Sequence, residues 1–181
     1  MNIVKRIAGM LEKNGKGLYG GEAVTQTQHA LQCAALAERS GAPAALVTAS
    51  LLHDIGHVLD PEFEAALERN EDLCHEEIGE TFLSEWFGEE VTQPVKMHVD
   101  AKRYLCAIDQ TYMDKLSPAS LHTLGLQGGP MSAEEVLAFE KNVHHRAAVR
   151  LRIWDDQAKD PGQVTPGIEH FMTYVRQSLK Q

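Results

Sequence analysis

The chain has 181 residues, which is enough for one domain with a complete hydrophobic core and too few for two. Its formal net charge of −9 argues against nucleic acid as a partner, since phosphate backbones bind to basic surfaces. No stretch approaches the roughly 20 apolar residues of a membrane span, and the amino terminus lacks the apolar core of a signal peptide. Three cysteines without an obvious pairing pattern (Cys33, Cys74 and Cys106) are typical of reduced thiols, so we expect a cytoplasmic protein with no membrane partner.

Apolar residues recur at helical spacing along the whole chain, and no segment shows the alternation of a β-strand. The first apolar stripe runs from Ile3 to Leu11 and leads into a glycine-rich loop around Tyr19. Further helices are expected over residues 24–39, from Pro43 through 59, over 74–87 and over 90–108. Residues 60–72 are polar and acidic, which indicates a loop or a short helical turn.

The last third of the chain carries three further helix signals. They are an opening at Ser117-Pro118 with an end at Gly128-Gly129, a capping-box pattern at Ser132 and Glu135 for a long helix to about residue 159, and a start at Thr165-Pro166. The sequence therefore predicts an all-α fold, a single helical bundle over residues 1–181 with one core.

The dipeptide His53-Asp54 follows the apolar run Ala49-Ser50-Leu51-Leu52, so both side chains are expected to be buried. A buried carboxylate needs a partner or a metal ion. The rest of a metal shell lies on other predicted helices: His29, His75, His98 and the pair Asp155-Asp156. Because helices of a bundle often hold metal ligands in its centre, these residues can converge there.

Four imidazoles and two carboxylates are too many for one ordinary site, and they suit two metal ions bridged by Asp54. This donor set fits iron, manganese or zinc, and affinity alone does not choose among them. A single histidine on a helix is more often a surface or core residue, so the prediction depends on the whole pattern. The remaining candidates are expected to be structural or exposed: His122, His144, His145 and His170.

This pattern resembles the HD-domain superfamily, whose members are mostly metal-dependent phosphohydrolases. Within it, the chain looks closer to the di-iron oxygenases of organophosphonate catabolism, which cleave the carbon–phosphorus bond of a 1-hydroxy-2-aminoethylphosphonate or its N-trimethylated analogue. The resemblance spans about Tyr19 to Asp155. Beyond the ligands it is carried by Tyr19-Gly20-Gly21-Glu22, by His57 closing His-Asp-Ile-Gly-His, by Lys102-Arg103-Tyr104-Leu105 and by Ser120…Thr123…Gln127-Gly128-Gly129.

The resemblance implies a mixed-valent pair of iron ions, Fe(II) and Fe(III), bridged by Asp54. One iron would be held by His29, His53 and Asp155, and the other by His75 and His98. Asp156 is the alternative to Asp155, and the resemblance favours the first aspartate after Trp154. Tyr19 and Glu22 would form a lid that covers an iron until substrate displaces it, although spacing alone favours a plain mobile loop.

The resemblance also implies a phosphonate-binding set. Lys102 and His57 lie one helical turn beyond His98 and His53, so each faces the metal ligands, and the Lys102 ammonium suits a phosphonate oxygen. Neutral donors on one helix face would complete the set: Ser120, Thr123 and Gln127. The alternatives are an exposed lysine, a core histidine and ordinary capping or surface polar residues.

Two departures from the aminoethyl-specific relatives bear on the substrate. Gly20 replaces a bulkier aliphatic residue and Asp100 replaces an amide, which would favour a larger cationic head, although Asp100 could be a surface residue. We therefore expect a trimethylammonium substrate, giving glycine betaine and phosphate, with the primary amine, giving glycine, as the alternative. An HD phosphohydrolase, in which the metal pair activates water, remains open. A non-enzymatic signalling module is disfavoured by the complete ligand set.

Overall fold

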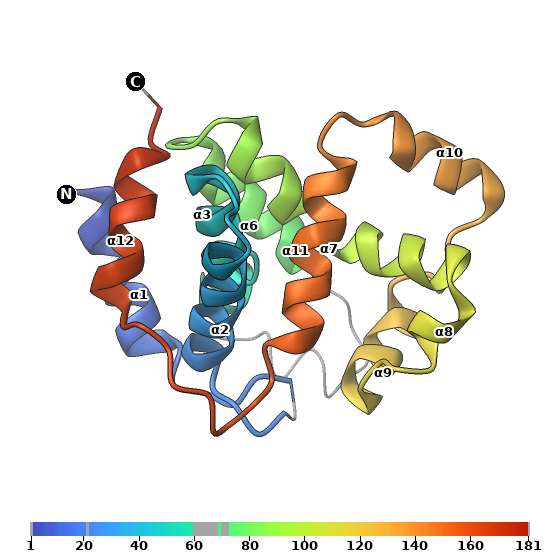
Figure 1. Ribbon diagram of the computed structural model, residues 1–181, viewed down its shortest axis with the longest axis horizontal. Helices are drawn as coiled ribbons and strands as arrows, with labels where there is room; N and C mark the ends of the chain where they lie inside the picture. Colours follow the sequence, from blue (N-terminus) through green and yellow to red (C-terminus); the bar gives the residue numbers. More distant parts are fainter. Residues whose placement is uncertain (1, 21, 60–68, 70–72, 181) are drawn as a thin grey trace.

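The computed structural model describes residues 2–20, 22–59, 69 and 73–180 (Figure 1). Within this part, the chain forms eleven helices, and its two isolated β-bridges do not make a sheet. The helices are α1 (Ile3–Asn14), α2 (Gln26–Arg39), α3 (Ala44–Leu52), α4 (Ile55–Leu59), α6 (His75–Ser84), α7 (Glu89–Ile108), α8 (Gln110–Met113), α9 (Pro118–Leu126), α10 (Ala133–Lys141), α11 (His145–Gln157) and α12 (Ile168–Gln177). The predicted all-α class is confirmed, and the segment predicted at 60–72 lies outside the described residues except for Arg69.

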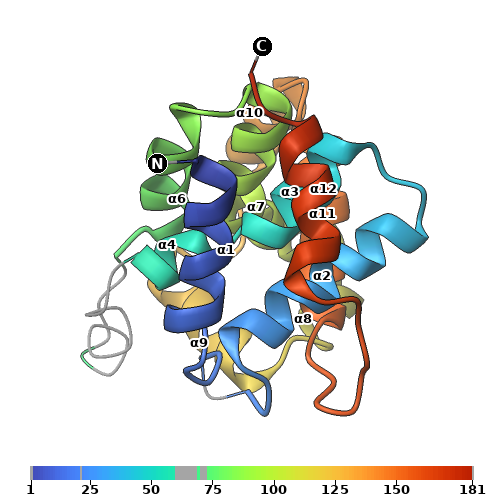
Figure 2. The same ribbon diagram turned by 90° about the vertical axis from the view of Figure 1, so that its left-hand side faces the viewer.

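The long helix α7 lies in the middle of the bundle and packs against α3, α6 and α11. The helices α1 and α12 lie at one end of the molecule, and α8, α9 and α10 lie at the other (Figure 1). In the view turned by 90°, α1 and α12 run side by side in front of α3 and α7 (Figure 2). The main core includes the fully buried Ile7, Leu52 and Phe171, and a smaller cluster around Phe139 joins α7, α10 and α11.

None of the helices in the described part of the chain is both long and apolar enough for a bilayer crossing. The cysteines Cys33, Cys74 and Cys106 are all in the reduced thiol form, as the sequence predicted. The predicted capping box of Ser132 with Glu135 is confirmed, and Thr25 with Gln28 forms a second reciprocal capping box at the start of α2.

The single helix predicted from Pro43 through 59 is wrong. The helix α3 ends at Leu52 and α4 begins at Ile55, so His53 and Asp54 form the turn between them. His53 keeps helical dihedral angles, and the chain tightens in the following turn, where the His57 amide donates to the Asp54 carbonyl at 3.0 Å. The predicted dipeptide is therefore buried as expected, but it lies at a helix junction.

The long helix predicted from Ser132 to about residue 159 is also wrong, because it is divided into α10 and α11. The division occurs at Asn142, whose backbone is extended with ψ 127°. Its side-chain oxygen accepts a hydrogen bond from the His144 amide at 2.9 Å, which competes with continuation of the helix. The second half, α11, then carries Asp155 toward the centre of the molecule.

Gly56 allows α4 and α6 to approach each other closely. A Cβ atom built at Gly56 would lie 2.1 Å from the His75 carbonyl oxygen, which is far inside van der Waals contact. We therefore expect Gly56→Ala to push α6 away from α4 and to lower the free energy of unfolding by about 1–3 kcal/mol, the usual cost of overpacking. Denaturant unfolding of the metal-free protein measures this loss.

The matched control is Gly9→Ala in α1, where an added Cβ meets no atom within 4 Å in the part of the chain that the structure describes. That change should leave stability unaltered or raise it by about 0.5–1 kcal/mol, because alanine favours helix. Equal unfolding free energies for the two variants would show that the close approach at Gly56 is not needed.

A candidate dinuclear metal centre

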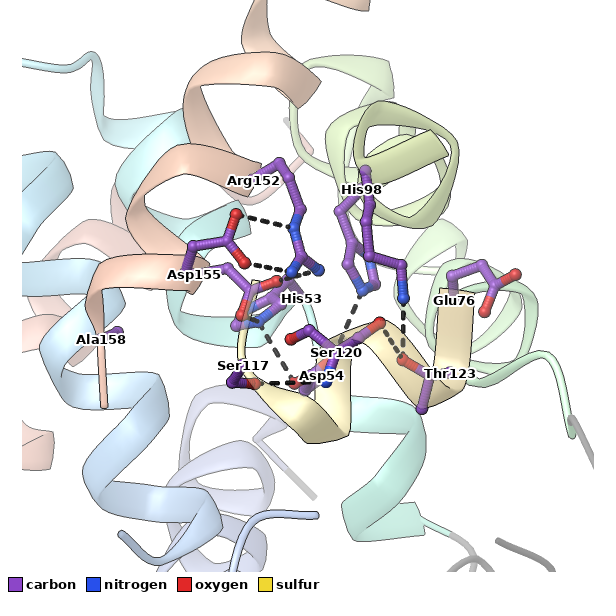
Figure 3. Close-up of polar contacts among 12 residues, drawn as sticks. His53, Asp54, Glu76, His98, Ser117, Ser120, Thr123, Arg152, Asp155 and Ala158 are labelled. Atoms are coloured by element: carbon purple, nitrogen blue, oxygen red, sulfur yellow. Dashed lines mark hydrogen bonds and ion pairs between the residues drawn. The ribbon is translucent and has the colours of Figure 1, made fainter. Parts of the chain in front are cut away.

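Six predicted metal ligands come together in the middle of the bundle from five separate elements. They are His29 on α2, His53 and Asp54 in the α3–α4 turn, His75 on α6, His98 on α7 and Asp155 on α11. All six are buried, with no more than 6% of their surface exposed. Figure 3 shows four of them, His53, Asp54, His98 and Asp155, gathered between the helices.

The Asp54 carboxylate divides its two oxygens between two pairs of histidines. Its Oδ2 atom lies 3.2 Å from His53 Nε2 and 3.6 Å from His29 Nε2. Its Oδ1 atom lies 3.2 Å from His75 Nε2 and 3.4 Å from His98 Nε2. These residues thus form two groups of potential ligands that share Asp54, which is the arrangement of a bridging carboxylate.

The outer ring nitrogen fixes the tautomer of three of these histidines. In each of them Nδ1 faces a backbone carbonyl oxygen, which can only accept, so Nδ1 carries the proton. The pairs are His29 with Ala158 at 2.9 Å, His53 with Ser50 at 2.9 Å and His98 with Val95 at 2.6 Å. In the neutral ring, Nε2 is then left with a lone pair that points into the cluster.

The inner ring nitrogens face each other at short range. Nε2 of His29 lies 3.1 Å from Nε2 of His53, and Nε2 of His75 lies 3.0 Å from Nε2 of His98. Without a cation these nitrogens and Asp54 must share protons to avoid repulsion between their lone pairs, whereas a metal ion between them would be coordinated by all of them. The donor set therefore fits a pair of metal ions, one for each pair of histidines.

Asp155 extends the first group. Its Oδ1 lies 3.3 Å from His29 Nε2 and 3.9 Å from His53 Nε2. Its Oδ2 forms an ion pair with Arg152 Nη1 at 2.7 Å, and this contact fixes the direction of the carboxylate (Figure 3). Asp155 can thus serve as a third ligand beside His29 and His53.

The alternative ligand, Asp156, lies outside the cluster. Its carboxylate accepts hydrogen bonds from the Arg152 guanidinium and from the Tyr112 hydroxyl. Since both oxygens have these partners, Asp156 is turned away from the histidines and supports Arg152 instead.

The electrostatic field of the cluster favours cations. Burial lowers the pKa of His53, but Asp54 and Asp155 raise it more, and the result is about 9. Burial raises the pKa of Asp54, yet His53 and its neighbouring imidazoles hold that pKa well below the usual range. A metal ion bound at this place would replace the proton that these groups otherwise attract.

Of the two predicted lid residues, Tyr19 lies against the first group. The Tyr19 ring stacks on the His29 ring, with 3.8 Å between ring centroids, and its hydroxyl donates to Asp155 Oδ1 at 3.4 Å. Burial and the two aspartates raise the pKa of Tyr19 well above its usual value, so the hydroxyl keeps its proton. Glu22 lies farther out, with Oε1 3.2 Å from Lys159 Nζ.

Two of the predicted phosphonate-binding residues, Lys102 and His57, have partners that the structure shows directly. Lys102 is buried, and its ammonium donates to Thr123 Oγ1 at 2.8 Å. Burial, with a smaller effect of Arg152, lowers the pKa of Lys102 to about 7. The His57 ring stacks on His75 with 4.2 Å between ring centroids, and burial holds the pKa of His57 well below its usual value.

Ser120 and Gln127 belong to the same short helix segment as Thr123. Ser120 is buried and accepts a hydrogen bond from Lys159, and Gln127 ends α9. The Gln127 Oε1 atom is buried and accepts no hydrogen bond from the described residues. The three side chains lie along α9 and its C-cap, and Figure 3 shows Ser120 and Thr123.

The structure does not bring Asp100 to the cluster. Its side chain is half exposed and pairs with Arg103 Nη1 at 3.3 Å. Since Asp100 lies only two residues after His98 on α7, helical geometry turns it away from the ligand face. Asp100 is therefore a surface residue, and it no longer supports the expectation of a substrate with a large cationic head group.

Sequence reasoning missed two cations of the site. Lys159 lies beyond the end of α11 at Gln157 and gave no signal of this kind, whereas Arg152 lies three residues before Asp155, one turn away on the same helix. That spacing was the available signal, since a carboxylate ligand on a helix is commonly supported from positions one turn away.

Comparison with known proteins agrees with this geometry. Residues 27–139 match the HD domain family. The chain is 42% identical over 178 residues (98% of this chain, 91% of the relative) to the (1-hydroxy-2-(trimethylamino)ethyl)phosphonate dioxygenase (glycine-betaine-forming) of Leisingera caerulea. It is 43% identical over 175 residues (94% and 85%) to the hydroxymethylphosphonate dioxygenase of Gimesia maris. An uncharacterized protein of Acanthamoeba polyphaga mimivirus is 35% identical over 180 residues (98% and 82%). The resemblance seen in the sequence is confirmed, and the chain belongs to the HD domain family.

Proposed function

We propose that this protein uses two iron ions and dioxygen to cleave the carbon–phosphorus bond of a 1-hydroxyphosphonate. The observation that carries the proposal is the Asp54 carboxylate, whose two oxygens face two separate pairs of histidine Nε2 atoms. Beside them lies Lys102, a buried ammonium of the kind that binds a phosphonate oxygen. The named activities of the two dioxygenase relatives, which align with nearly the whole chain, support the same reaction class.

Metal ions held by the six ligands would supply a Lewis acid for the substrate hydroxyl and a redox partner for dioxygen. The protein's own groups bind and orient the phosphonate. The Lys102 ammonium donates to one phosphonate oxygen, and the hydroxyls of Ser120 and Thr123 donate to others. His57, whose Nε2 lies 3.8 Å from Asp54 Oδ1, is neutral at pH 7 and can donate or accept one hydrogen bond at the substrate.

The overall change consumes one molecule of dioxygen for each carbon–phosphorus bond that is cleaved. The carbon–phosphorus and carbon–hydrogen bonds of the substrate break, the carbon becomes a carboxylate, and the phosphorus leaves as phosphate. One atom of dioxygen ends in each product. Tyr19 covers the His29 and Asp155 side, so water and dioxygen are excluded there until the loop moves. The reduced thiols suit a cytoplasmic location for this reaction.

The trimethylammonium compound is our preferred substrate, with glycine betaine and phosphate as products. Support comes from the name of the Leisingera caerulea relative and from the space at Gly20, where an added Cβ meets no atom of the described residues within 4 Å. The primary amine, giving glycine, is the alternative. The Gimesia maris relative is named for hydroxymethylphosphonate, which carries no amine head group. This compound should be tested as a substrate beside the other two.

An oxygen electrode with parallel phosphate measurement tests the proposal. Anaerobically iron-loaded protein is given each of the three hydroxyphosphonates in turn, and the oxygen consumed is compared with the phosphate released. We expect a ratio of one to one and the highest kcat/KM for the trimethylammonium compound. Phosphate release from a phosphate ester without oxygen consumption would favour a phosphohydrolase instead.

Lys102→Ala should weaken substrate binding more than it slows the chemical step. The loss of a charged hydrogen bond costs about 1.5–3 kcal/mol, so we expect KM to rise roughly tenfold to a hundredfold. Steady-state kinetics of the iron-loaded variant measures this rise. Lys141→Ala, at an exposed position on α10, is the control and should keep the KM of the unaltered protein. An unchanged KM in Lys102→Ala would remove Lys102 from the phosphonate site.

A further inference from the structure

The ammonium of Lys159 lies where the Tyr19–Glu22 loop meets α9. Its Nζ donates to Ser120 Oγ at 3.0 Å and to Ser117 Oγ at 3.3 Å. The same atom lies 3.2 Å from Glu22 Oε1 and 5.8 Å from the centre of the Tyr19 ring. Only 13% of the side chain is exposed, so this cation is held among a few polar groups.

The contact between Lys159 and Glu22 is incomplete. Glu22 Oε1 is buried, yet it accepts no hydrogen bond from any described residue, and the Lys159 ammonium is its ion-pair partner. An ion pair that lacks a well-directed hydrogen bond is weaker than a charge-assisted hydrogen bond. A better anion can therefore replace the Glu22 carboxylate at Lys159.

Two ammonium groups are bound along α9. Lys102 donates to Thr123 and Lys159 donates to Ser120, three residues earlier on the same helix. Side chains three residues apart in a helix lie on the same side, so both cations approach one stretch of α9. A phosphonate dianion bound by Ser120 and Thr123 would be matched by these two charges.

We propose that Lys159 is a second cationic phosphonate-binding residue, which exchanges Glu22 for a phosphonate oxygen and so couples substrate binding to release of the loop. Release of Glu22 also frees Tyr19, because the Glu22 amide donates to the Tyr19 carbonyl at 2.7 Å within one turn of the loop. The exchange forms and breaks only non-covalent contacts. This assignment rests on the proposed function, since it takes a phosphonate as the ligand.

If Glu22 and the phosphonate compete for Lys159, their effects on binding are coupled. Removing the Glu22 charge should strengthen phosphonate binding, because Lys159 no longer has to exchange a partner. The same change should have no effect once Lys159 is gone. Removing the Lys159 charge alone should weaken binding about tenfold to a hundredfold, the effect of one charged hydrogen bond.

Methylphosphonate is the probe, because it lacks the hydroxyl group and is not turned over. Its affinity for the anaerobic iron-loaded protein is measured by calorimetry in Glu22→Gln, Lys159→Met and the double variant, with Lys141→Met as control. We expect several-fold tighter binding in Glu22→Gln, the weakening given above in Lys159→Met, and the same weakened value in the double variant. Lys159→Arg, which keeps the charge, should bind within a few-fold of the unaltered protein.

Hydrogen exchange of the amides at residues 15–25 gives the second readout. Methylphosphonate should speed exchange there in the unaltered protein and in Lys159→Arg, and should have no effect in Lys159→Met. Unweakened binding in Lys159→Met, or the same effect of Glu22→Gln with and without Lys159, would overturn the assignment. If Lys159→Met does not fold, the Lys159→Arg background is used instead. The assignment would then be overturned if Glu22→Gln no longer strengthened methylphosphonate binding in that background. A protein that binds methylphosphonate in this way but cleaves no hydroxyphosphonate contradicts the proposed function and leaves Lys159 assigned.

Discussion

Asp54→Asn is expected to remove both metal ions from the protein. The amide keeps the shape of the carboxylate but loses its charge, and its nitrogen cannot coordinate, so neither pair of histidines keeps an anionic ligand from residue 54. Metal analysis after anaerobic reconstitution should fall from two ions to fewer than one per chain, with complete loss of phosphate release. The reason is geometric, since Oδ1 and Oδ2 of Asp54 each lie 3.2 Å from a different histidine Nε2.

His75→Ala provides the contrast that a bridging role requires. It disturbs only the group of Asp54 with His98, so the ion held by His29, His53 and Asp155 should remain. We expect about one ion per chain in this variant. Asp114→Asn, at an exposed position after α8, should retain two ions. Full occupancy in Asp54→Asn would show that the carboxylate does not join the two groups.

Arg152→Met is expected to cost about 3–5 kcal/mol of the free energy of unfolding in the metal-free protein, the usual penalty for removing one partner of a buried ion pair. The Arg152 guanidinium is 5% exposed and contacts both Asp155 and Asp156. Without it, two neighbouring carboxylates lose their shared countercharge. Methionine keeps most of the side-chain volume, so the loss reports on charge and hydrogen bonds.

The same variant should also bind metal less tightly, because Asp155 Oδ2 loses the contact at 2.7 Å that fixes the carboxylate. A loss of roughly tenfold to a hundredfold in metal affinity is typical when such a supporting group is removed. Arg146→Met, an exposed position on the same helix, is the control and should change stability by less than about 0.5 kcal/mol. Similar losses in the two variants would show that Arg152 has no special role.

The sequence predicted best those features for which few residue types are suitable, such as buried metal ligands. A histidine next to an aspartate after an apolar run predicted a buried ligand pair, and His53 and Asp54 are indeed almost fully buried. The periodic apolar positions predicted most of the helices, because helical spacing is a strong signal over ten or more residues. Helix boundaries were less predictable, since a single side-chain contact such as that of Asn142 with the His144 amide ends a helix.

Side-chain partners were the least predictable part of the site. Nothing in the spacing of Asp155 and Asp156 shows that Tyr112 holds the second aspartate, because Tyr112 comes from another helix, α8. Asp100 was expected at the substrate, but the turn of α7 directs it to Arg103. Lys159 went unnoticed, since its partners Glu22 and Ser120 are brought to it only by the fold.

The most direct test of the account is a crystal structure of the anaerobically iron-loaded protein, with anomalous diffraction measured at the iron absorption edge. We expect two iron peaks about 3.5–4 Å apart, the spacing of paired metal ions in enzymes, with one Asp54 oxygen coordinated to each. One peak should lie between His29, His53 and Asp155, and the other between His75 and His98. A single iron, or a pair in which Asp54 contacts only one ion, would contradict it.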